Sequence, residues 1–496
     1  MMGALVLRNI RRCLFTCPSL AVLVLLLLHG LLGCTSVKSV QDPSLACAVP
    51  AAQENSSRLS FFLNFARSEV PPLNLKINAV EIFDGDLWVP VSFDTREIDT
   101  KKIGRQQVWL GSIELYPANY EKVRLTFSPE ATIVSQGQES KMILEELETE
   151  IPFPGTFNLQ SETSDSIFLS WDVESSFNGR NLGPLAITLT TSGLSPITAN
   201  QIYVACPDIN TIYVVREDKK WVNNSFFVAG RPTYVVVDSV RQRIYVLCQE
   251  DGDIKIFDLL TNSLADIISL PMTFRPIFMS VSADLNNAYI IDDLGLLSVV
   301  DLHAGNVIAR KRIGQRPIYV AYLPEIKTVA VSSSMDSRIY LLDEQDLEIR
   351  DQIVVNGSPA GIFRKDGFLY VAEEQSNSIM VYDFNLRTKV KSVFVGYAPH
   401  RITGLDNNIY VANSGSGSVS LLKTLSNRVS REIPLGNEVY EIVASEKEQV
   451  VYIGKNDNED CGGSVSVLDN TSNRVIAEIE LGARPLGIAV AGNGSL

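Results

Sequence analysis

The sequence predicts an all-β protein in which a β-sandwich is followed by a seven-bladed β-propeller that the C-terminal strand closes. Three observations lead to this fold class: a short strand that recurs seven times, a proline that opens a strand in most repeats, and two-residue alternation in the region before them. We expect the sandwich over residues 59–195 and the propeller over residues 196–496, after an export signal over 1–33 and a flexible tether over 34–58.

The recurring strand places one residue between aliphatic neighbours, as in Ile202-Tyr203-Val204. Successive centres are 40 to 44 residues apart, which is the length of a four-stranded propeller blade. The seven centres are Tyr203, Tyr245, Tyr289, Ala330, Tyr370, Tyr410 and Tyr452.

A second marker, a proline, opens the innermost strand in six of the seven repeats: Pro232, Pro276, Pro317, Pro359, Pro399 and Pro485. After Pro485 the chain has room for one strand only, and the first repeat, which starts near Gln201, lacks its innermost strand. We therefore expect residues 486–491 to complete the first blade, because an open blade would expose unpaired strand edges.

These repeats resemble the YVTN-repeat β-propellers, which are surface and periplasmic proteins of bacteria and archaea. The Gly-x-x-Pro opening, the Ile-Tyr-Val strand and the aspartate that ends the third strand match over residues 201–492, whereas Ala330, Leu422 and Val439 depart from the pattern. The resemblance implies the fold and leaves the function open, because propellers of this type serve many purposes.

The region before the repeats alternates apolar and polar residues, which indicates half-buried antiparallel strands and a sandwich of six to eight of them. It resembles a domain of unknown function in bacterial surface lipoproteins, an immunoglobulin- or prealbumin-like sandwich. The matching segments are Leu75–Ile82, Trp88, Pro117–Leu125, Leu169–Ser176, Leu182 and Pro184. The resemblance implies either carbohydrate binding, with Trp88 and Trp171 stacking on a sugar ring, or a structural spacer with both in the core.

The N-terminus predicts export and lipid anchoring. Residues 1–19 carry three arginines and no acid, and residues 20–28 are entirely apolar, as in a signal peptide. The stretch ends in Leu31-Leu32-Gly33-Cys34, which resembles the bacterial lipobox and implies diacylation of Cys34; an uncleaved signal anchor is the alternative. Thr35 is not the aspartate that retains such proteins in the inner membrane, so the outer membrane is favoured over the inner.

Charge narrows the classes of partner. The formal net charge is −14 and the pI about 4.9, so the chain would repel nucleic acid, and we expect protein or glycan partners at the cell envelope. The sequence contains no motif for a nucleotide, haem or metal cofactor, so no cofactor is predicted.

The arginines that precede the prolines are candidate ligand-binding residues. They occupy one repeated position, so they would share a rim and attract an anion. The alternative is that each pairs with an aspartate that ends a third strand, namely Asp258, Asp301 or Asp469. The candidate rim consists of Arg231, Arg275, Arg316 and Arg484, with His400 and Arg401 nearby.

A catalytic role has one candidate constellation. Glu441, His400 and Arg401 are the titratable residues near the predicted pore mouth that suit a lactonase-like hydrolase. Their order matches no lactonase motif, so the sequence favours a non-catalytic binding or scaffold module and leaves the enzyme open. Tyr234, Phe278 and Tyr319 either line the pore mouth or pack within the ring.

The remaining features concern stability. Cys206 and Cys461 would lie in adjoining blades, where a disulfide could brace the ring closure, with buried free thiols as the alternative. The acidic run over residues 456–460 is interpreted as a solvated loop or, less favourably, a calcium site.

Overall fold

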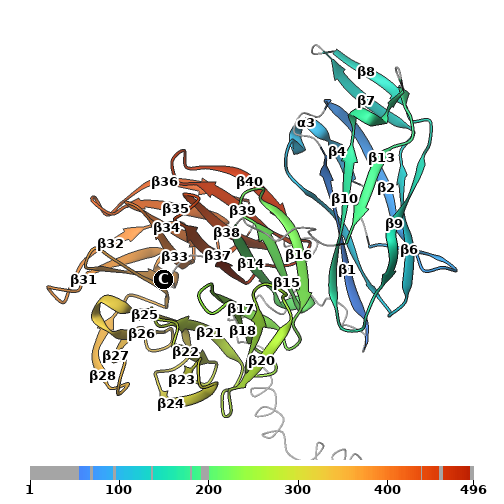
Figure 1. Cartoon of the computed structure of the whole chain (residues 1–496). Coiled ribbons are helices and arrows are strands. Elements are labelled where there is room, and N and C mark those ends of the chain that lie inside the picture. Colours follow the sequence, from blue (N-terminus) through green and yellow to red (C-terminus); the bar gives the residue numbers. More distant parts are fainter. Residues whose placement is uncertain are drawn as a thin grey trace, which may run out of the picture. The chain divides into compact units, whose positions relative to one another are not determined.

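The described part of the chain is built from β-strands, with one short helix, α3 (Thr100–Ile103), and four single turns of 3-10 helix (Figure 1). The computed structural model describes residues 55–66, 71–92, 96–135, 138–178, 181–191, 200–436, 438–456 and 462–491. The predicted all-β class is confirmed. Cys34, Cys461 and most of the acidic run at 456–460 lie outside the described residues. Within those residues, no helix has the length and apolar character needed to cross a membrane.

The N-terminal described region forms two sheets and one two-stranded ribbon. The strands are β1 (Ser57–Phe65), β2 (Leu73–Phe83), β3 (Trp88–Pro90), β4 (Arg96–Asp99), β5 (Val108–Leu115), β6 (Asn119–Phe127), β7 (Glu130–Ser135), β8 (Gln138–Ile143), β9 (Glu148–Asn158), β10 (Ser164–Asp172), β11 (Phe177–Asn178), β12 (Asn181–Leu182) and β13 (Ala186–Thr190). One sheet has the order β13-β10-β1-β5, and the other has β8-β7-β2-β6-β9 with β3 and β4 on β2. The two sheets hold more strands than the six to eight expected, and β1 pairs with β10 in parallel, where antiparallel pairing was expected.

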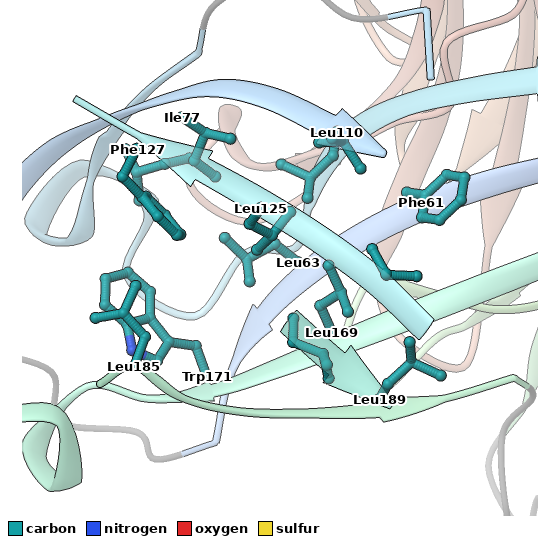
Figure 2. Packing of buried hydrophobic residues seen from close by; sticks show 14 of the residues in the cluster. Phe61, Leu63, Ile77, Leu110, Leu125, Phe127, Leu169, Trp171, Leu185 and Leu189 are labelled. Carbon is teal, nitrogen blue, oxygen red and sulfur yellow. The ribbon is translucent and has the colours of Figure 1, made fainter. Parts of the chain in front are cut away.

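Apolar residues from both sheets form one core (Figure 2). The core forms because successive residues of a strand point to opposite faces of the sheet. In strand β2, Leu73, Leu75 and Ile77 are buried while Asn74 and Lys76 between them are not. Figure 2 shows Trp171 among these apolar side chains. It is 1% exposed, and its Nε1 donates a hydrogen bond to Ser176 Oγ at 3.0 Å, which satisfies its one polar atom. Trp171 is therefore a core residue.

Strand β1 is buried on both faces. One face enters the core just described, and the other contacts the first sheet of the propeller. There Phe62 stacks on Phe168 with ring centroids 5.7 Å apart and meets the edge of Tyr213, while the hydroxyls of Ser60 and Tyr213 are hydrogen-bonded at 2.8 Å. The side chain of Gln107 adds two hydrogen bonds to the backbone of Val222. Apolar burial and these directional bonds together fix the contact.

The propeller region consists of seven successive four-stranded sheets, the blades, as the period predicts. From the innermost strand outward, the first blade consists of β41 (Gly487–Val490), β14 (Gln201–Cys206), β15 (Thr211–Arg216) and β16 (Trp221–Phe227). The second consists of β17 (Pro232–Asp238), β18 (Arg243–Cys248), β19 (Asp253–Asp258) and β20 (Leu264–Ser269). The third consists of β21 (Pro276–Val281), β22 (Asn287–Asp292), β23 (Leu296–Asp301) and β24 (Asn306–Arg312). The next two are β25 (Pro317–Leu323), β26 (Thr328–Ser333), β27 (Arg338–Asp343), β28 (Ile349–Val354); and β29 (Pro359–Lys365), β30 (Phe368–Glu373), β31 (Ser378–Asp383), β32 (Thr388–Phe394). The last two are β33 (Pro399–Leu405), β34 (Asn408–Asn413), β35 (Ser418–Lys423), β36 (Arg428–Pro434); and β37 (Glu438–Ser445), β38 (Val450–Asn456), β39 (Gly463–Asp469), β40 (Arg474–Glu480).

The recurring second strands form the packed layers between blades. Their central tyrosines are at most 2% exposed, and each belongs to a cluster shared by neighbouring blades. Where such a hydroxyl is buried, it finds a polar partner: Tyr410 donates to Asn470 Oδ1 at 2.7 Å and Tyr370 to Asn427 Oδ1 at 2.9 Å. The recurring tyrosine is thus a packing residue with one satisfied polar atom.

The ring closes as predicted. Strand β41 pairs antiparallel with β14, from Ile202 opposite Val490 to Ala205 opposite Gly487. The innermost strands contact one another in circular order, and β41 lies between β37 and β17. Gly487 permits this approach, since a Cβ there would lie 2.8 Å from the carbonyl oxygen of Thr233. The C-terminal strand therefore completes the first blade and removes its free edge.

An ionic clamp reinforces the closure. Asp208, in the turn after β14, pairs with NH2 of Arg484 at 3.0 Å and with NH1 of Arg231 at 3.1 Å. Arg484 precedes β41 and Arg231 precedes β17, so one carboxylate joins the C-terminal segment to the first and second blades. Asp208 and Arg484 are largely buried, at 14% and 6% side-chain exposure, so these pairs are poorly screened by water.

We expect Asp208→Ala to lower the free energy of unfolding by about 3 kcal/mol, because two largely buried guanidinium groups would lose their counter-charge. Urea denaturation measures the loss. Asp293→Ala is the matched control, because Asp293 pairs with Arg275 at 3.7 Å where both side chains are more than 40% exposed; it should cost less than about 1 kcal/mol. Equal losses in the two variants would contradict the clamp.

Candidate functional site

The loop face of the propeller is the side on which the loops entering the innermost strands meet the loops between second and third strands. In four blades the residue before the proline has a shared backbone role there. Its carbonyl accepts an N–H from the residue after the second strand, as in Gln249 to Arg231 at 3.0 Å and Ser334 to Arg316 at 3.1 Å. Ser358 and Ala398 accept the same bond in their blades, so the backbone role does not require arginine.

The predicted rim of arginines does not form one cationic ring. Arg231 and Arg484 share Asp208, Arg275 lies beside Asp293, and Arg316 is exposed. The alternative prediction was right that arginines at this position meet aspartates for Arg231, Arg275 and Arg484, but wrong about which aspartates. Asp258, Asp301 and Asp469 instead accept hydrogen bonds from backbone N–H groups in the turns after their strands. Asp258 Oδ1 accepts from Leu260 and Thr261, both at 3.0 Å. Asp301 accepts from His303 and Ala304, and Asp469 accepts from Ser472.

The pore layer is a ring of seven residues, one near the start of each innermost strand, and it contains the group that sequence reasoning singled out. In six blades the residue lies two positions after the proline, and in the blade without a proline it is Glu441, two positions after Val439. The members of the pore layer are Tyr234, Phe278, Tyr319, Gly361, Arg401, Glu441 and Gly487. The centroids of the Tyr234 and Phe278 rings are 4.3 Å apart, and those of Phe278 and Tyr319 are 4.4 Å apart. The Cζ atom of Arg401 lies 4.6 Å and 4.9 Å from the centroids of Phe278 and Tyr319.

Arg401 closes the pore at this layer. Its Nε is 3.5 Å from Oε2 of Glu441, and its guanidinium lies over two aromatic faces. Within the described residues its NH1 is buried and has no hydrogen-bond acceptor, so the aromatic rings are its remaining electrostatic partners. A desolvated cation–π contact of this kind contributes about 2 kcal/mol. Tyr234, Phe278 and Tyr319 pack on one another and also line the cavity, so both interpretations of these residues hold in part.

Burial sets the protonation of the neighbouring groups. Glu441 is 5% exposed, and its burial raises the pKa of its carboxyl while Arg401 acts in the opposite direction. Its Oε1 accepts a hydrogen bond from the backbone N–H of Ile442 at 3.0 Å. Burial also raises the pKa of Glu374, which feels the charges of Arg316 and Arg401.

The predicted catalytic trio is assembled only in part. Arg401 and Glu441 come together, and Glu441 lines a cavity. The His400 ring instead meets the edge of the Tyr440 ring at 6.0 Å and is not among the cavity-lining residues. Burial, with Arg401 nearby, lowers the pKa of His400 well below its usual value, so this histidine is neutral near pH 7.

A cavity of about 240 Å³ extends along the pore from the pore layer. It ends beside Arg364 and Glu325, whose side chains pair at 2.7 Å. Sequence reasoning missed this pair because the two residues come from different blades. The sequence signal that could have found the pair is their place in the repeat, because both residues lie near the ends of innermost strands, at the face opposite the loop face.

Apolar side chains gather on the loop face around the third to sixth blades. Five of them, which we call the apolar rim, are between 53% and 83% exposed: Met272, Phe274, Leu294, Met335 and Tyr397. Phe274 and Tyr397 occupy the same repeat position, two residues before the proline. Exposed apolar residues that share one face are typical of interaction sites.

Trp88 is half-buried, not fully in the core. Its ring lies against Phe83, with centroids 5.2 Å apart, and the Cζ atom of Arg124 is 4.2 Å from its centroid. Lys122 lies near the same ring. A sugar that stacked on the face under Arg124 would first have to displace that side chain.

The predicted disulfide and the possible calcium site both involve residues that lie outside the described part of the chain. Cys206 and Cys248 are buried at equivalent positions, where other blades place Asp292, Ser333 or Glu373. The Cys206–Cys461 disulfide stays a prediction, since Cys461 lies outside the described residues. Among the described residues there is no cluster of three or more histidine, cysteine or acidic side chains suited to a metal ion.

The fold and site thus define a closed seven-bladed β-propeller with an attached two-sheet domain. No family model and no curated protein matches the chain. Among solved structures, it is similar to a functionally unknown protein from Desulfotomaculum acetoxidans, at 14% identity and a TM-score of 0.51, over 59% of this chain and 99% of that one. This similarity shows a shared fold. Two others have TM-scores of 0.45: the dihydro-heme d1 dehydrogenase NirN (13% identity, 60% of this chain, 76% of that one) and U3-55K (12%, 52% and 84%).

We expect His400 to make stability fall as the pH drops below about 6.5. The pKa of His400 is lower in the folded chain than in the unfolded chain, so below about pH 6.5 the unfolded chain binds a proton at this histidine while the folded chain does not. The free energy of unfolding should therefore fall by up to about 1.4 kcal/mol per pH unit. Urea denaturation from pH 7.5 to 5 should show a shallower decline for His400→Gln. His303→Gln, at an exposed turn position, should keep the decline of the unmodified chain. An unchanged slope in His400→Gln would overturn the assignment.

Proposed function

We propose that this protein is a lipid-anchored, non-catalytic binding or scaffold module of the bacterial cell envelope, and that it recognises a partner through the loop face of its propeller. The observation that carries the proposal is the apolar rim, whose five side chains share the face on which the blade loops meet. The pore also supports a non-catalytic role, because Arg401 is stacked on aromatic rings and ion-paired with Glu441 rather than presented to a substrate.

The sequence supports the location. The lipobox-like stretch ending in Cys34 would attach the chain to a membrane, with the outer membrane favoured, and two or three acyl chains hold a protein where one does so only marginally. The resemblance to YVTN-repeat propellers and to lipoprotein-associated sandwiches agrees with such a place. The net charge of −14 favours protein or glycan partners over nucleic acid.

The apolar rim predicts which surface a partner needs. A triple variant, Phe274→Ser, Leu294→Ser and Tyr397→Ser, should lose most of the protein that the anchored full chain captures from intact envelopes, because anchor side chains dominate binding energy. Quantitative mass spectrometry of the captured material measures the loss. The control carries Leu260→Ser and Leu425→Ser, two residues 79% and 92% exposed in turns on the opposite face. Equal capture by both variants would contradict partner binding through the loop face.

Glu441 favours a second candidate, a lactonase-like hydrolase. A buried carboxyl with a raised pKa beside an arginine, at the wall of a cavity, has the features of a general acid or base. If this holds, the protein should hydrolyse members of a lactone panel, and Glu441→Gln should lower kcat/KM at least about a hundred-fold. Failure of the unmodified protein to turn over any lactone would exclude this candidate.

A further inference from the structure

The cavity in the pore has the construction of a small-molecule site, and it lies apart from the apolar rim. At its closed end are Tyr234, Phe278, Tyr319 and Glu441 of the pore layer. It extends to Leu323, Pro324 and Glu325, which end the innermost strand β25 and the turn after it. Because β25 begins on the loop face, these last residues lie at the opposite face. The Glu325 side chain is 60% exposed there, which marks the mouth.

The wall between the two ends combines apolar side chains with polar groups. It is formed by alternate residues of the innermost strands, including Val236, Ala321, Val443 and Ala489, with the hydroxyl residues Ser280 and Thr403. An apolar cavity of about 150 Å³ stays dry and takes up benzene, so a cavity of about 240 Å³ has room for one ring and a few further atoms. The aromatic end favours a planar guest, since offset or edge contacts between rings contribute about 0.5–1.5 kcal/mol beyond burial.

The charges at both ends exclude an ionic guest. A cation would compete with Arg401, which already occupies the aromatic faces of Phe278 and Tyr319. An anion would meet the carboxyl of Glu441 at the closed end and would lose its hydration on entering the cavity. At the mouth, Arg364 is neutralised by Glu325. The Glu441 carboxyl can accept one hydrogen bond from a neutral donor.

We propose that the pore cavity binds a small neutral aromatic molecule that carries one hydroxyl or N–H donor, such as a phenol or an indole, entering beside Arg364 and Glu325. The ring would pack on the aromatic residues of the pore layer and the donor would reach Glu441. The mouth of the cavity opens on the face opposite the apolar rim, so access to the cavity does not depend on partner binding through that rim.

Isothermal titration of the intact protein with five probes tests the proposal: phenol, indole, benzene, benzoate and benzylammonium. We expect phenol and indole to bind with stoichiometry near one and at least ten-fold more tightly than benzoate or benzylammonium, with benzene weaker than phenol. Absence of phenol and indole binding, or equal binding of either ion, would overturn the proposal.

Filling the cavity locates the binding. Ala321→Phe and, independently, Ala489→Phe place a ring inside the wall from different blades, and each should abolish the phenol signal. Leu260→Phe adds the same ring on an exposed turn and should leave phenol binding unchanged. Circular dichroism identifies a variant that fails to fold, in which case the other one decides. Phenol binding that survives in a folded cavity-filled variant would place the site elsewhere and overturn the proposal.

Discussion

The pairing of β41 with β14 is the constraint on which the rest of the propeller depends. Each of the other blades is continuous in the chain, whereas the first joins residues almost 300 positions apart, from Ile202 to Val490. Without this ladder two strand edges would be exposed, and β37 and β17 would lose the strand between them. The Asp208 clamp lies at this seam, which places its ionic contacts where the chain alone does not hold the ring together.

Closure also positions the pore. The pore layer collects one residue from each innermost strand, so the contact of Arg401 with Phe278 and Tyr319 exists only while all seven blades keep their places. The loop face exposes the apolar rim, and the opposite face gives access to an aromatic-ended cavity. Two binding roles can therefore coexist in one rigid body.

The fold was predictable because it repeats. The period of the Tyr-containing strands set the blade number, and Pro485 with too little chain after it predicted the composite blade. The contacts of β1 were harder to predict, although the unbroken Phe61-Phe62-Leu63 run signals a strand buried on both faces. The cationic rim was wrong because the third-strand aspartates are used by their own turns, while Asp208 sits in a turn that no repeat marker identifies. Contacts across the pore join residues of different blades, such as Arg401 and Phe278, and no local pattern encodes them.

Hydrogen exchange on a chain that ends at Pro485, compared with the full chain, tests the closure most directly. If β41 holds the ring, amides of the second strands in every blade should lose protection together, including β26 and β30 on the far side of the ring. Loss of protection confined to β14, β15 and β16 would contradict this, because the first blade would then fray alone while the other six stayed folded.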